Sequence, residues 1–500
     1  MSGSAVRWRL TQINAHPRAA PQYRCMIQPT LQHPQFSRVP VFDAGLIARY
    51  DVNGPRYTSY PTAPQFHDRF GVDDLARIAR ISNEDPIPRA LSIYVHIPFC
   101  LSPCFYCGCT RIITRNTRRA DEYLDRLVRE IEMTAPMFDR DRRVNQLHLG
   151  GGTPNFLDEA QMRRLMTALR AGFNLSTEAD REFGVEIDPR FADAGMVHVL
   201  AELGFNRISI GIQDFDPEVQ VAVNRVQSVE QTRAVIDAAR ECGFRSVNVD
   251  LIHGLPKQTT ARFARTLEAV VALRPDRVAT YSYAHMPDRF SAQKQIVTAD
   301  LPDAATRLAL MGQTVHALGA AGYRYIGLDH FALEQDELCQ AQRDGTLQRN
   351  FQGYSTHGDC DLVGLGMSAI GHVGRSFHQN ARDLPYYYAA IDSGQMPVRK
   401  GVLLSDDDVI RADVIQQLMC HGGLDTADFA HRHEHAFSDY FAAEMPRLHA
   451  LAADGLIEWN SRGLQVTARG RFLLRIVAMC FDRYLVSAGS TVQAAHSKAL

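Results

Sequence analysis

The sequence predicts an α/β fold: a partial (β/α)6 TIM-like barrel of parallel strands, followed by a mainly helical C-terminal domain. Three observations predict it. Short β-rich segments alternate with amphipathic segments from Leu91 onward, and glycines stand where the amphipathic segments end. The residues with unusual chemistry recur where the β-rich segments end. Successive β–α units with right-handed crossovers place their strands side by side, so they predict one curled parallel sheet.

The six predicted strands are short runs rich in β-branched and aromatic residues. The stretches between them are long enough for the helices that parallel connections require. The strands comprise residues 91–99 (LSIYVHIPF), 146–152 (QLHLGGG), 182–189 (EFGVEIDP), 206–213 (NRISIGIQ), 246–254 (SVNVDLIHG) and 277–287 (RVATYSYAHMP).

Helical periodicity appears between these strands, for example in residues 121–133 and 229–243. In the second segment small or apolar residues recur four apart while charges take the opposite face, as in an amphipathic helix. Gly204 and Gly243 stand where helix C-terminal caps are expected.

Composition indicates an ordinary globular protein, with 45% hydrophobic and 22% charged residues among 500. The net charge of −2 gives no global reason to expect nucleic acid or an anionic membrane as a partner. The longest uncharged glycine-rich run, residues 362–374, is too short to span a bilayer, and no apolar signal peptide opens the chain. We therefore expect a cytoplasmic protein, in which clustered thiols are metal ligands or catalysts.

Residues 1–42 differ from the rest, with five arginines, no lysine and no acidic residue. A disordered basic extension explains this composition. A transit peptide, or a start assigned too early with Met26 as the true one, explains it as well.

Polar and reactive residues stand at or near the carboxyl end of each predicted strand. In parallel sheets these ends share one edge, where ligands bind, so together the residues predict one shared site. They are Cys100, the GGGTP run at 150–154, Glu186 with Asp188, Gln213, Asp250 and Ala284.

Four of the ten cysteines fall between Cys100 and Cys109. Cys100, Cys104 and Cys107 provide three thiolates on one loop, as iron–sulfur sites do. Structural zinc sites usually draw ligand pairs from two segments, and no second Cys-x2-Cys follows, whereas a redox dithiol needs only one such pair. Three thiolates on a four-iron cluster leave one iron open for chemistry. Zinc remains the alternative, and the role of Cys109 stays open.

Several motifs resemble a known family in order and spacing. CLSPCFYC resembles the Cys-x3-Cys-x2-Cys signature of radical S-adenosylmethionine enzymes, and GGGTP their glycine-rich segment. GPRYTSYPTA, YVHIPFC, CGC, VEIDPR, GIQDF, DLIHGLP, YAHMP, NFQGYST and GLGMSAI resemble the oxygen-independent coproporphyrinogen III oxidases. The resemblance runs from about Asp43 to near the C-terminus.

The resemblance implies that the chain converts coproporphyrinogen III to protoporphyrinogen IX in haem biosynthesis by decarboxylating two propionate side chains to vinyl groups. A [4Fe–4S] cluster on Cys100, Cys104 and Cys107 would cleave S-adenosylmethionine to a 5′-deoxyadenosyl radical. The cofactor supplies the chemistry and the protein supplies position and a dry cavity.

The family binds two S-adenosylmethionine molecules, and the matching positions of this chain imply two sets of contacts. Carboxylates suit ribose hydroxyls or an ammonium group, and an arginine suits a carboxylate. The first set is Tyr94, Gly151, Glu186 and Ile370; the second is Tyr106, Gly152, Thr153, Gln213, Arg225, Asp250 and Ala284.

The resemblance and the motifs divide the chain into five predicted parts. Arg56 and Tyr57 are the predicted contacts to the substrate, an anion with four carboxylates, because their segment precedes the barrel. The parts are the basic extension (1–42), a segment over the barrel mouth (43–84), the core (85–325), a connecting and cofactor-contacting segment (326–384) and the helical C-terminal domain (385–500).

The C-terminal domain reads as helix, hairpin around residues 460–463, then helix. This order resembles a winged helix, which favours DNA binding; the neutral charge favours the helical lid found in the resembled family. Two alternatives to the enzyme remain: a relative that carries haem or modifies another substrate, and a non-catalytic iron–sulfur or zinc protein. An unidentified reductant and an unidentified electron acceptor are implied, no nucleic-acid or membrane partner is expected, and the resemblance implies a monomer.

Overall fold

The computed structural model describes residues 39–487. The interpretations of the basic extension at residues 1–42 therefore fall almost entirely outside the described residues. Within residues 39–487, no helix is long and apolar enough to cross a membrane.

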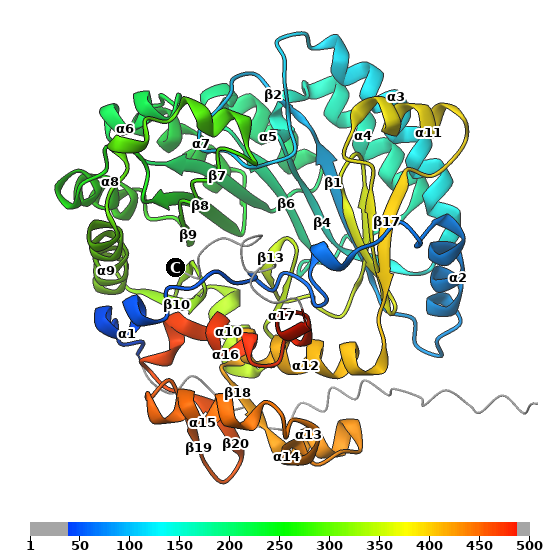
Figure 1. Cartoon of the computed structure of the whole chain (residues 1–500). Coiled ribbons are helices and arrows are strands. Elements are labelled where there is room, and N and C mark those ends of the chain that lie inside the picture. The colour runs from blue at the N-terminus through cyan, green and yellow to red at the C-terminus, as the bar shows by residue number, and fades with distance from the viewer. Residues whose placement is uncertain (1–38, 488–500) are drawn as a thin grey trace, which may run out of the picture. The chain divides into compact units, whose positions relative to one another are not determined.

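All six predicted strands form, and they lie in one sheet as parallel neighbours in their order along the chain. This confirms the predicted fold class. Figure 1 shows the sheet curving around an interior. The strands are Leu91–Ile97 (β1), Arg143–Gly151 (β4), Glu182–Ile187 (β6), Arg207–Gln213 (β7), Ser246–His253 (β8) and Arg277–Ser282 (β9).

Both edges of this parallel sheet continue into later parts of the chain. With the short strand Asn174–Leu175 (β5), which pairs with β4, the sheet has 13 strands. At one edge β14 pairs in parallel with β1, so that Gly364 lies beside Tyr94, and three antiparallel strands follow. At the other edge an antiparallel hairpin extends β9. The added strands are Asp361–Leu365 (β14), Ile370–Val373 (β15), Ser376–Asn380 (β16), Val398–Leu403 (β17), His330–Leu333 (β11) and Tyr323–Gly327 (β10).

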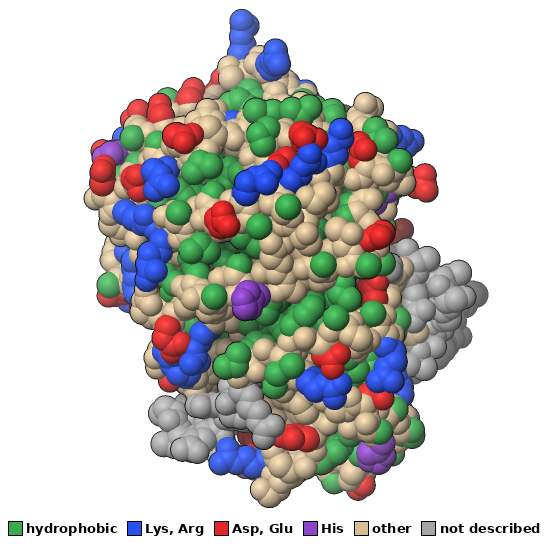
Figure 2. Space-filling view, turned by 90° about the vertical axis from the view of Figure 1, so that its left-hand side faces the viewer, with side chains coloured by type: hydrophobic (Ala, Val, Ile, Leu, Met, Phe, Trp, Pro, Cys, Tyr) green, Lys and Arg blue, Asp and Glu red, His purple; other side chains and the backbone are tan. Residues whose placement is uncertain are grey.

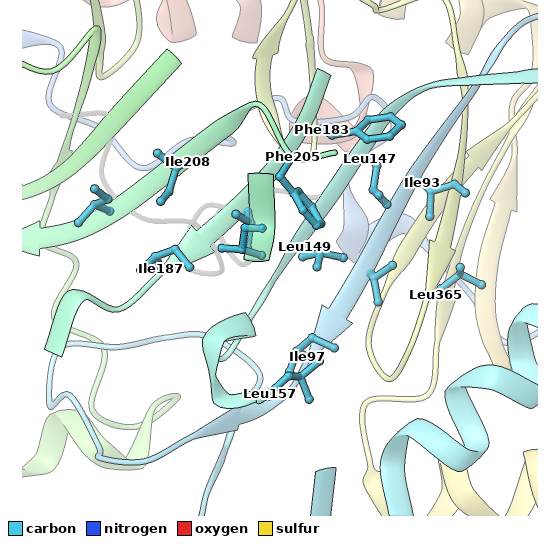
Figure 3. Packing of buried hydrophobic residues seen from close by; sticks show 14 of the residues in the cluster. Ile93, Ile97, Leu147, Leu149, Leu157, Phe183, Ile187, Phe205, Ile208 and Leu365 are labelled. Atoms are coloured by element: carbon cyan, nitrogen blue, oxygen red, sulfur yellow. The ribbon is translucent and has the colours of Figure 1, made fainter. Parts of the chain in front are cut away.

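Helices cover the outer face of the sheet, as Figure 1 shows. Alternate strand residues point toward these helices and are apolar, for example Ile93, Leu147, Phe183 and Ile208, which are buried (Figure 3). Gly204 and Gly243 have positive φ just after α5 and α7, which confirms the predicted caps. The helices are Arg118–Thr134 (α3), Glu159–Gly172 (α4), Ala194–Glu202 (α5), Pro217–Ala222 (α6), Val229–Glu241 (α7), Thr260–Leu273 (α8), Ala304–Ala320 (α9) and Leu384–Asp392 (α11).

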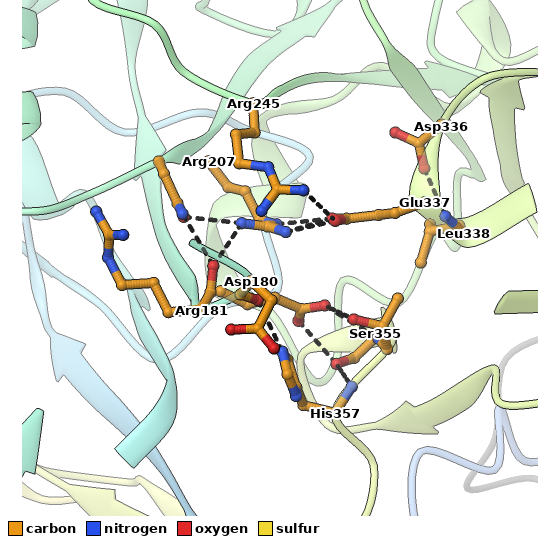
Figure 4. A network of polar contacts seen from close by, with 12 residues as sticks. Asp180, Arg181, Arg207, Arg245, Asp336, Glu337, Leu338, Ser355 and His357 are labelled. Carbon is orange, nitrogen blue, oxygen red and sulfur yellow. Dashed lines mark hydrogen bonds and ion pairs between the residues drawn. The ribbon is translucent and has the colours of Figure 1, made fainter. Parts of the chain in front are cut away.

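The inner face of the same strands is polar, and ion pairs and hydrogen bonds fill its amino end. Arg207 and Arg277 pair with Glu337, at 2.5 and 2.7 Å. Glu182 accepts hydrogen bonds from Gln146 and from residues 355–356. The connecting segment around residues 336–357 therefore closes this end of the barrel (Figure 4).

The chain after β17 forms helices and a small antiparallel sheet. A helix precedes a hairpin of β19 and β20, and a further helix follows, as the sequence predicts. Tyr57 and Tyr60 are buried in the same hydrophobic group as the helices here, so the predicted mouth segment packs on this part. The elements are Asp406–His421 (α12), Gly423–Asp425 (β18), Thr426–His433 (α13), Met445–Ala453 (α15), Ile457–Trp459 (β19), Gly463–Val466 (β20), Leu474–Met479 (α16) and Arg483–Ser487 (α17).

Candidate active site

The four clustered cysteines lie on a loop that leaves β1. Cys100 and Cys104 are buried, Cys107 is half-buried and Cys109 is exposed. Two short strands, Phe99–Cys100 (β2) and Ile112–Ile113 (β3), pair in parallel and close the loop at its base. The Arg111 guanidinium donates to the carbonyl oxygens of Cys104 and Cys107, at 3.1 Å each, and so holds the loop from within.

A buried histidine connects this loop to the barrel interior. His96 Nε2 lies 2.9 Å from the Thr110 carbonyl oxygen, and its Nδ1 lies 3.1 Å from the Tyr94 hydroxyl. The Nε2 nitrogen therefore carries the proton, because a carbonyl can only accept. Tyr94, a predicted cofactor contact, is oriented by the same ring that fixes the loop.

Hydrogen-bond donors surround the thiols. Arg190 and Arg225 each point a guanidinium nitrogen at Cys104 Sγ, at 3.5 Å, and Thr153 Oγ1 lies 3.3 Å from Cys100 Sγ. The Cys109 backbone N–H donates to Cys107 Sγ at 3.4 Å. The hydrogen bond with the Cys109 side chain lowers the pKa of the Cys107 thiol to about 6, whereas burial raises that of Cys100 to about 11.

The thiol arrangement fits an iron–sulfur cluster better than zinc. Within residues 39–487, no three side chains of His, Cys, Asp or Glu are placed to hold one metal ion. The three thiols come from one loop, whereas structural zinc sites usually draw their ligands from two segments. In a four-iron cluster each thiolate binds its own iron, so the sulfurs stand apart around a larger body.

The glycine run at 150–152 is required by crowding. A Cβ on Gly151 would lie 2.7 Å from His96 Nδ1, and one on Gly152 would lie 2.7 Å from the Pro98 backbone. Gly151 also has a φ of 119°, which side-chain-bearing residues rarely adopt. The glycines let the second strand approach the cysteine-bearing strand closely, a reason for them that the sequence did not reveal.

Glu186 projects from β6 into the barrel interior, where its side chain is 45% exposed. Its carboxylate accepts from His148 Nε2 at 3.2 Å and from the Gly151 N–H at 3.3 Å. Tyr94 stacks on His148, with ring centroids 6.1 Å apart. Glu186, Gly151 and Tyr94, three predicted contacts from three segments, thus surround one space.

Asp250 projects into the same interior from β8. It accepts from Ser209 Oγ at 3.1 Å and from Asn248 Nδ2 at 3.0 Å. Burial, with a contribution from nearby Glu186, raises its pKa to about 6. A carboxylate that is costly to ionise here is suited to a ligand that donates hydrogen bonds or carries positive charge.

Arg225 and Asp188 form a buried ion pair at the carboxyl end of the strands, at 3.1 Å. Arg225 also donates to the Gly211 carbonyl oxygen at 2.6 Å, while its Nε has no partner among the described residues. Gln213, which ends β7, has a φ of 70°. Such strain outside glycine persists at sites that the surrounding structure holds in place.

The remaining predicted cofactor contacts lie around this interior in two places. Gln293 Nε2 donates to the carbonyl oxygens of Tyr106 and Ala284, at 2.9 and 3.2 Å, and so joins these two positions. Ile370 begins β15, and a Cβ on Gly364 would lie 2.7 Å from the Ile370 backbone. Because Gly364 pairs with Tyr94, Ile370 lies on the side of β1 opposite to the glycine run.

The two predicted substrate contacts point different ways. Arg56 forms an ion pair with Asp329 and lies 5.5 Å from the Tyr281 ring, beside the barrel interior. Tyr57 is buried and donates to Asp482 at 3.0 Å, so its hydroxyl faces the C-terminal helices.

Two arginines of this region were not predicted. Arg349 is buried and donates to the Arg56 and Tyr57 carbonyl oxygens, at 2.8 and 2.7 Å, and its Nε has no partner among the described residues. Arg190 pairs with Asp188 at 2.6 Å as well as facing Cys104. Arg190 is the last residue of the VEIDPR motif, and Arg349 directly precedes the NFQGYST motif. Their position beside these motifs was the only sequence feature that could have identified them.

Comparisons with known proteins match most of the chain. The profile of the Radical SAM superfamily matches residues 94–270, and that of the HemN C-terminal domain matches residues 404–473, starting where β17 ends. The oxygen-independent coproporphyrinogen III oxidase of Pseudomonas aeruginosa is 52% identical over 446 residues, 89% of this chain and 96% of that one. The Escherichia coli K12 protein of the same name is 48% identical over 445 residues, again 89% and 96%.

A solved structure is similar over nearly the whole chain. Coproporphyrinogen III oxidase (HemN) from Escherichia coli, described as a radical SAM enzyme, has a TM-score of 0.85 at 46% identity, covering 90% of this chain and 100% of that one. Membership in this superfamily implies a [4Fe–4S] cluster and S-adenosylmethionine, which the thiols and the interior fit. The chain belongs to the oxygen-independent coproporphyrinogen III oxidase family of radical S-adenosylmethionine enzymes.

Proposed function

We propose that this chain converts coproporphyrinogen III to protoporphyrinogen IX without oxygen, decarboxylating two propionate side chains to vinyl groups in haem biosynthesis. The observation that carries the proposal is the three-cysteine loop set over an interior lined by Tyr94, Glu186 and Asp250. The identity of 52% with a relative of that name, over 96% of its length, supports the same substrate.

Cys100, Cys104 and Cys107 would hold the cluster, and Arg111 and His96 keep their loop in place for it. When bound, the cluster and S-adenosylmethionine supply a 5′-deoxyadenosyl radical that takes a hydrogen atom from the propionate. The protein contributes donors around sulfur: Arg190 and Arg225 lie 3.5 Å from Cys104 Sγ. Such outer contacts tune the ligands of a metal site.

The interior carboxylates would bind the cationic, hydroxyl-rich S-adenosylmethionine. Two molecules are proposed, because the motifs shared with the family imply two sets of contacts. Tyr94, Gly151, Glu186 and Ile370, around β1, would bind the first. Tyr106, Gly152, Thr153, Gln213, Arg225, Asp250 and Ala284, mostly on the far strands, would bind the second.

Arg56 would bind a propionate carboxylate of the substrate. Its guanidinium lies beside the ring of Tyr281, which is on β9. Buried Arg349 donates a hydrogen bond to the Arg56 backbone carbonyl oxygen and so holds this segment in place. Arginine forms charge-assisted, bidentate hydrogen bonds with carboxylates. The Tyr57 hydroxyl would support this segment through Asp482, so its role is to position Arg56.

The proposal requires a one-electron reductant for the cluster and an electron acceptor for the product-forming step. We place the reaction in the cytoplasm and propose that the chain acts as a monomer. The helical part after β17, on which the segment with Arg56 packs, would act as a cover for the interior. We also propose that the chain is divided into the five parts predicted from the sequence.

Anaerobic reconstitution tests the function. The protein loaded with iron and sulfide receives dithionite, S-adenosylmethionine and coproporphyrinogen III, and the products are separated by chromatography. Protoporphyrinogen IX together with 5′-deoxyadenosine is expected. 5′-Deoxyadenosine with untouched porphyrinogen would make the substrate wrong, and neither product from a loaded protein would contradict the catalytic function. Arg56→Lys, which keeps the charge but not the bidentate geometry, should raise KM for the porphyrinogen about tenfold.

A further inference from the structure

A basic surface lies beside the cysteine loop although the whole chain is nearly neutral. The loop between β3 and α3 and the adjoining ends of α11 and β17 contribute its side chains. Figure 1 places the loop before α3 at the top of the view, and Lys and Arg side chains project from the top of the view turned about the vertical axis (Figure 2). We define the basic surface as Arg115, Arg118, Arg119, Arg382, Arg399 and Lys400.

These cations are unbalanced. Among the described residues, no carboxylate oxygen lies within 4.0 Å of any of the six, whereas most exposed arginines elsewhere on the chain have such a partner, as Arg163 has Glu159 and Glu202. From Cys100 to Ala120 the sequence contains four arginines and no acidic residue. The surface therefore carries a concentrated positive potential.

The start of α3 shows that helix stability does not explain these charges. Arg118 and Arg119 are the first two residues of α3, where the helix dipole disfavours cations. Other helices follow the usual rule: α12 begins with three aspartates. Arg118 and Arg119 stand at the unfavourable end of the helix, and among the described residues neither has a carboxylate oxygen within 4.0 Å, although Asp121 lies in the same turn. This placement favours a partner outside the chain.

The surface is joined directly to the loop that carries the cysteines. Arg382 Nη2 donates to Thr110 Oγ1 at 3.2 Å, next to Cys109. Arg119 lies 5.9 Å from the ring of Phe99, the residue before Cys100. Exposed apolar side chains stand among the cations, with Ile113 at 41% and Tyr386 at 49% exposure. Charges around a few apolar groups are typical of transient docking surfaces.

We propose that the basic surface docks an acidic protein that donates one electron to the cluster. The inference rests on the proposed function, since only a redox cluster on this loop needs such a partner. The donor loses one electron and the cluster gains one, so no further reactant is required. A basic surface beside the cysteine loop attracts an acidic donor to that side of the loop, which brings the electron close to the cluster ligands.

Binding of a probe donor tests this directly. Reduced flavodoxin, an acidic one-electron flavoprotein, is titrated into the cluster-loaded protein without oxygen, by calorimetry, and the rate of cluster reduction is followed by absorbance. The double variant Arg115→Glu/Arg118→Glu should weaken binding and slow reduction at least about tenfold at low salt. In the unchanged protein both should weaken as salt rises from 0.02 to about 0.3 M, because charge–charge attraction is screened.

A second double variant controls for net charge. Arg233→Glu/Lys294→Glu reverses two exposed cations that also have no carboxylate within 4.0 Å in the described part of the chain, on α7 and on the turn Ser291–Gln295. It should bind flavodoxin as the unchanged protein does. Equal loss in both double variants, or no loss in the first, would overturn the proposal.

Dithionite separates this proposal from the proposed function. A small reductant needs no docking surface, so all variants should release 5′-deoxyadenosine at the same rate with dithionite. Loss of that activity in the unchanged protein would contradict the proposed function, and its loss in the first double variant alone would show that these arginines serve the fold instead, which overturns the docking proposal.

Discussion

Two glutamates on one strand show how differently the two ends of the barrel are built. Glu182, at the amino end of β6, is buried and accepts from Gln146, Ser355 and Thr356 at 2.9, 2.8 and 3.0 Å. Glu186, four residues later, keeps 45% of its side chain exposed. The same side chain on the same strand is therefore structural at one end and available to a ligand at the other.

The ionisable groups follow the same division. At the amino end the pKa of Glu182 is lowered: burial opposes this, but Arg207 and the Thr356 hydroxyl outweigh it. At the carboxyl end burial raises the pKa of Asp250 to about 6. The amino end pairs its interior carboxylate with arginine. At the carboxyl end Asp188 pairs with Arg225, but neither Glu186 nor Asp250 has an arginine or lysine within 4.0 Å among the described residues. Four experiments test this contrast.

The largest effect is expected at the cysteine loop. Cys104→Ser should lower turnover by about 10³-fold or more, because an alcohol is a poor ligand for iron. The free energy of unfolding of the metal-free protein should change by less than about 1 kcal/mol. Urea unfolding and a 5′-deoxyadenosine assay measure the two effects. Cys242→Ser, outside the site, should change neither; a large loss of stability in Cys104→Ser would instead make the loop a structural metal site.

The reverse pattern is expected at the amino end. Glu182→Ala should lower the free energy of unfolding by about 3 kcal/mol, because several buried donors lose their acceptor. The Kd for S-adenosylmethionine of the folded protein should stay the same, as measured by calorimetry at 10 °C. Glu202→Ala removes an exposed ion pair with Arg163 and should cost less than about 1 kcal/mol. A higher Kd for S-adenosylmethionine in Glu182→Ala would contradict the view that the amino end of the barrel is structural and only the carboxyl end binds ligands.

Asp250→Asn should change the free energy of unfolding by a smaller amount and in the opposite direction, making the protein more stable. The folded protein holds this carboxyl with a raised pKa, so its ionisation costs stability at pH values above about 6. Asparagine removes that cost and should raise the free energy of unfolding at pH 8 by about 1 kcal/mol, while weakening S-adenosylmethionine binding about tenfold. Equal stability with unchanged binding would remove Asp250 from the site.

The smallest effect is the pH dependence of cofactor binding. On the proposed function the carboxylate form of Asp250 binds the cofactor, so the Kd for S-adenosylmethionine should rise as pH falls through about 6, by about tenfold at pH 5. Calorimetric titrations between pH 5 and 8 measure this. Asp250→Asn should show a flat profile over the same range. A parallel rise in the variant would assign the titration to another group.

The sequence predicts what local patterns encode. The six parallel strands follow from short β-rich runs, the caps at Gly204 and Gly243 from helix chemistry, and the gathering of Glu186 and Asp250 from the rule that parallel strands end together. The identity of the family follows from motifs. For these features the information lies within one β–α unit.

Features that depend on contacts between distant segments could not be predicted from the sequence. The pairing of β1 with β14 leaves no local trace, because a short apolar run such as residues 362–365 fits many positions in a core. The ion pair of Arg207 with Glu337 joins residues 130 apart. The crowding of Gly151 against His96 likewise required the structure, since the motif alone does not show which residues lie against the glycines.

The parallel pairing of β1 with β14 affects the order in which the protein folds during its synthesis. During synthesis β1 finds its first neighbour, β4, early, but its other edge stays open until Asp361 has been made. At ribosomal rates of about 5–20 residues per second, that edge waits on the order of tens of seconds. The cysteine loop thus leaves the ribosome long before its strand is flanked on both sides, and we expect stable metal loading only after residues 361–365 have paired with β1.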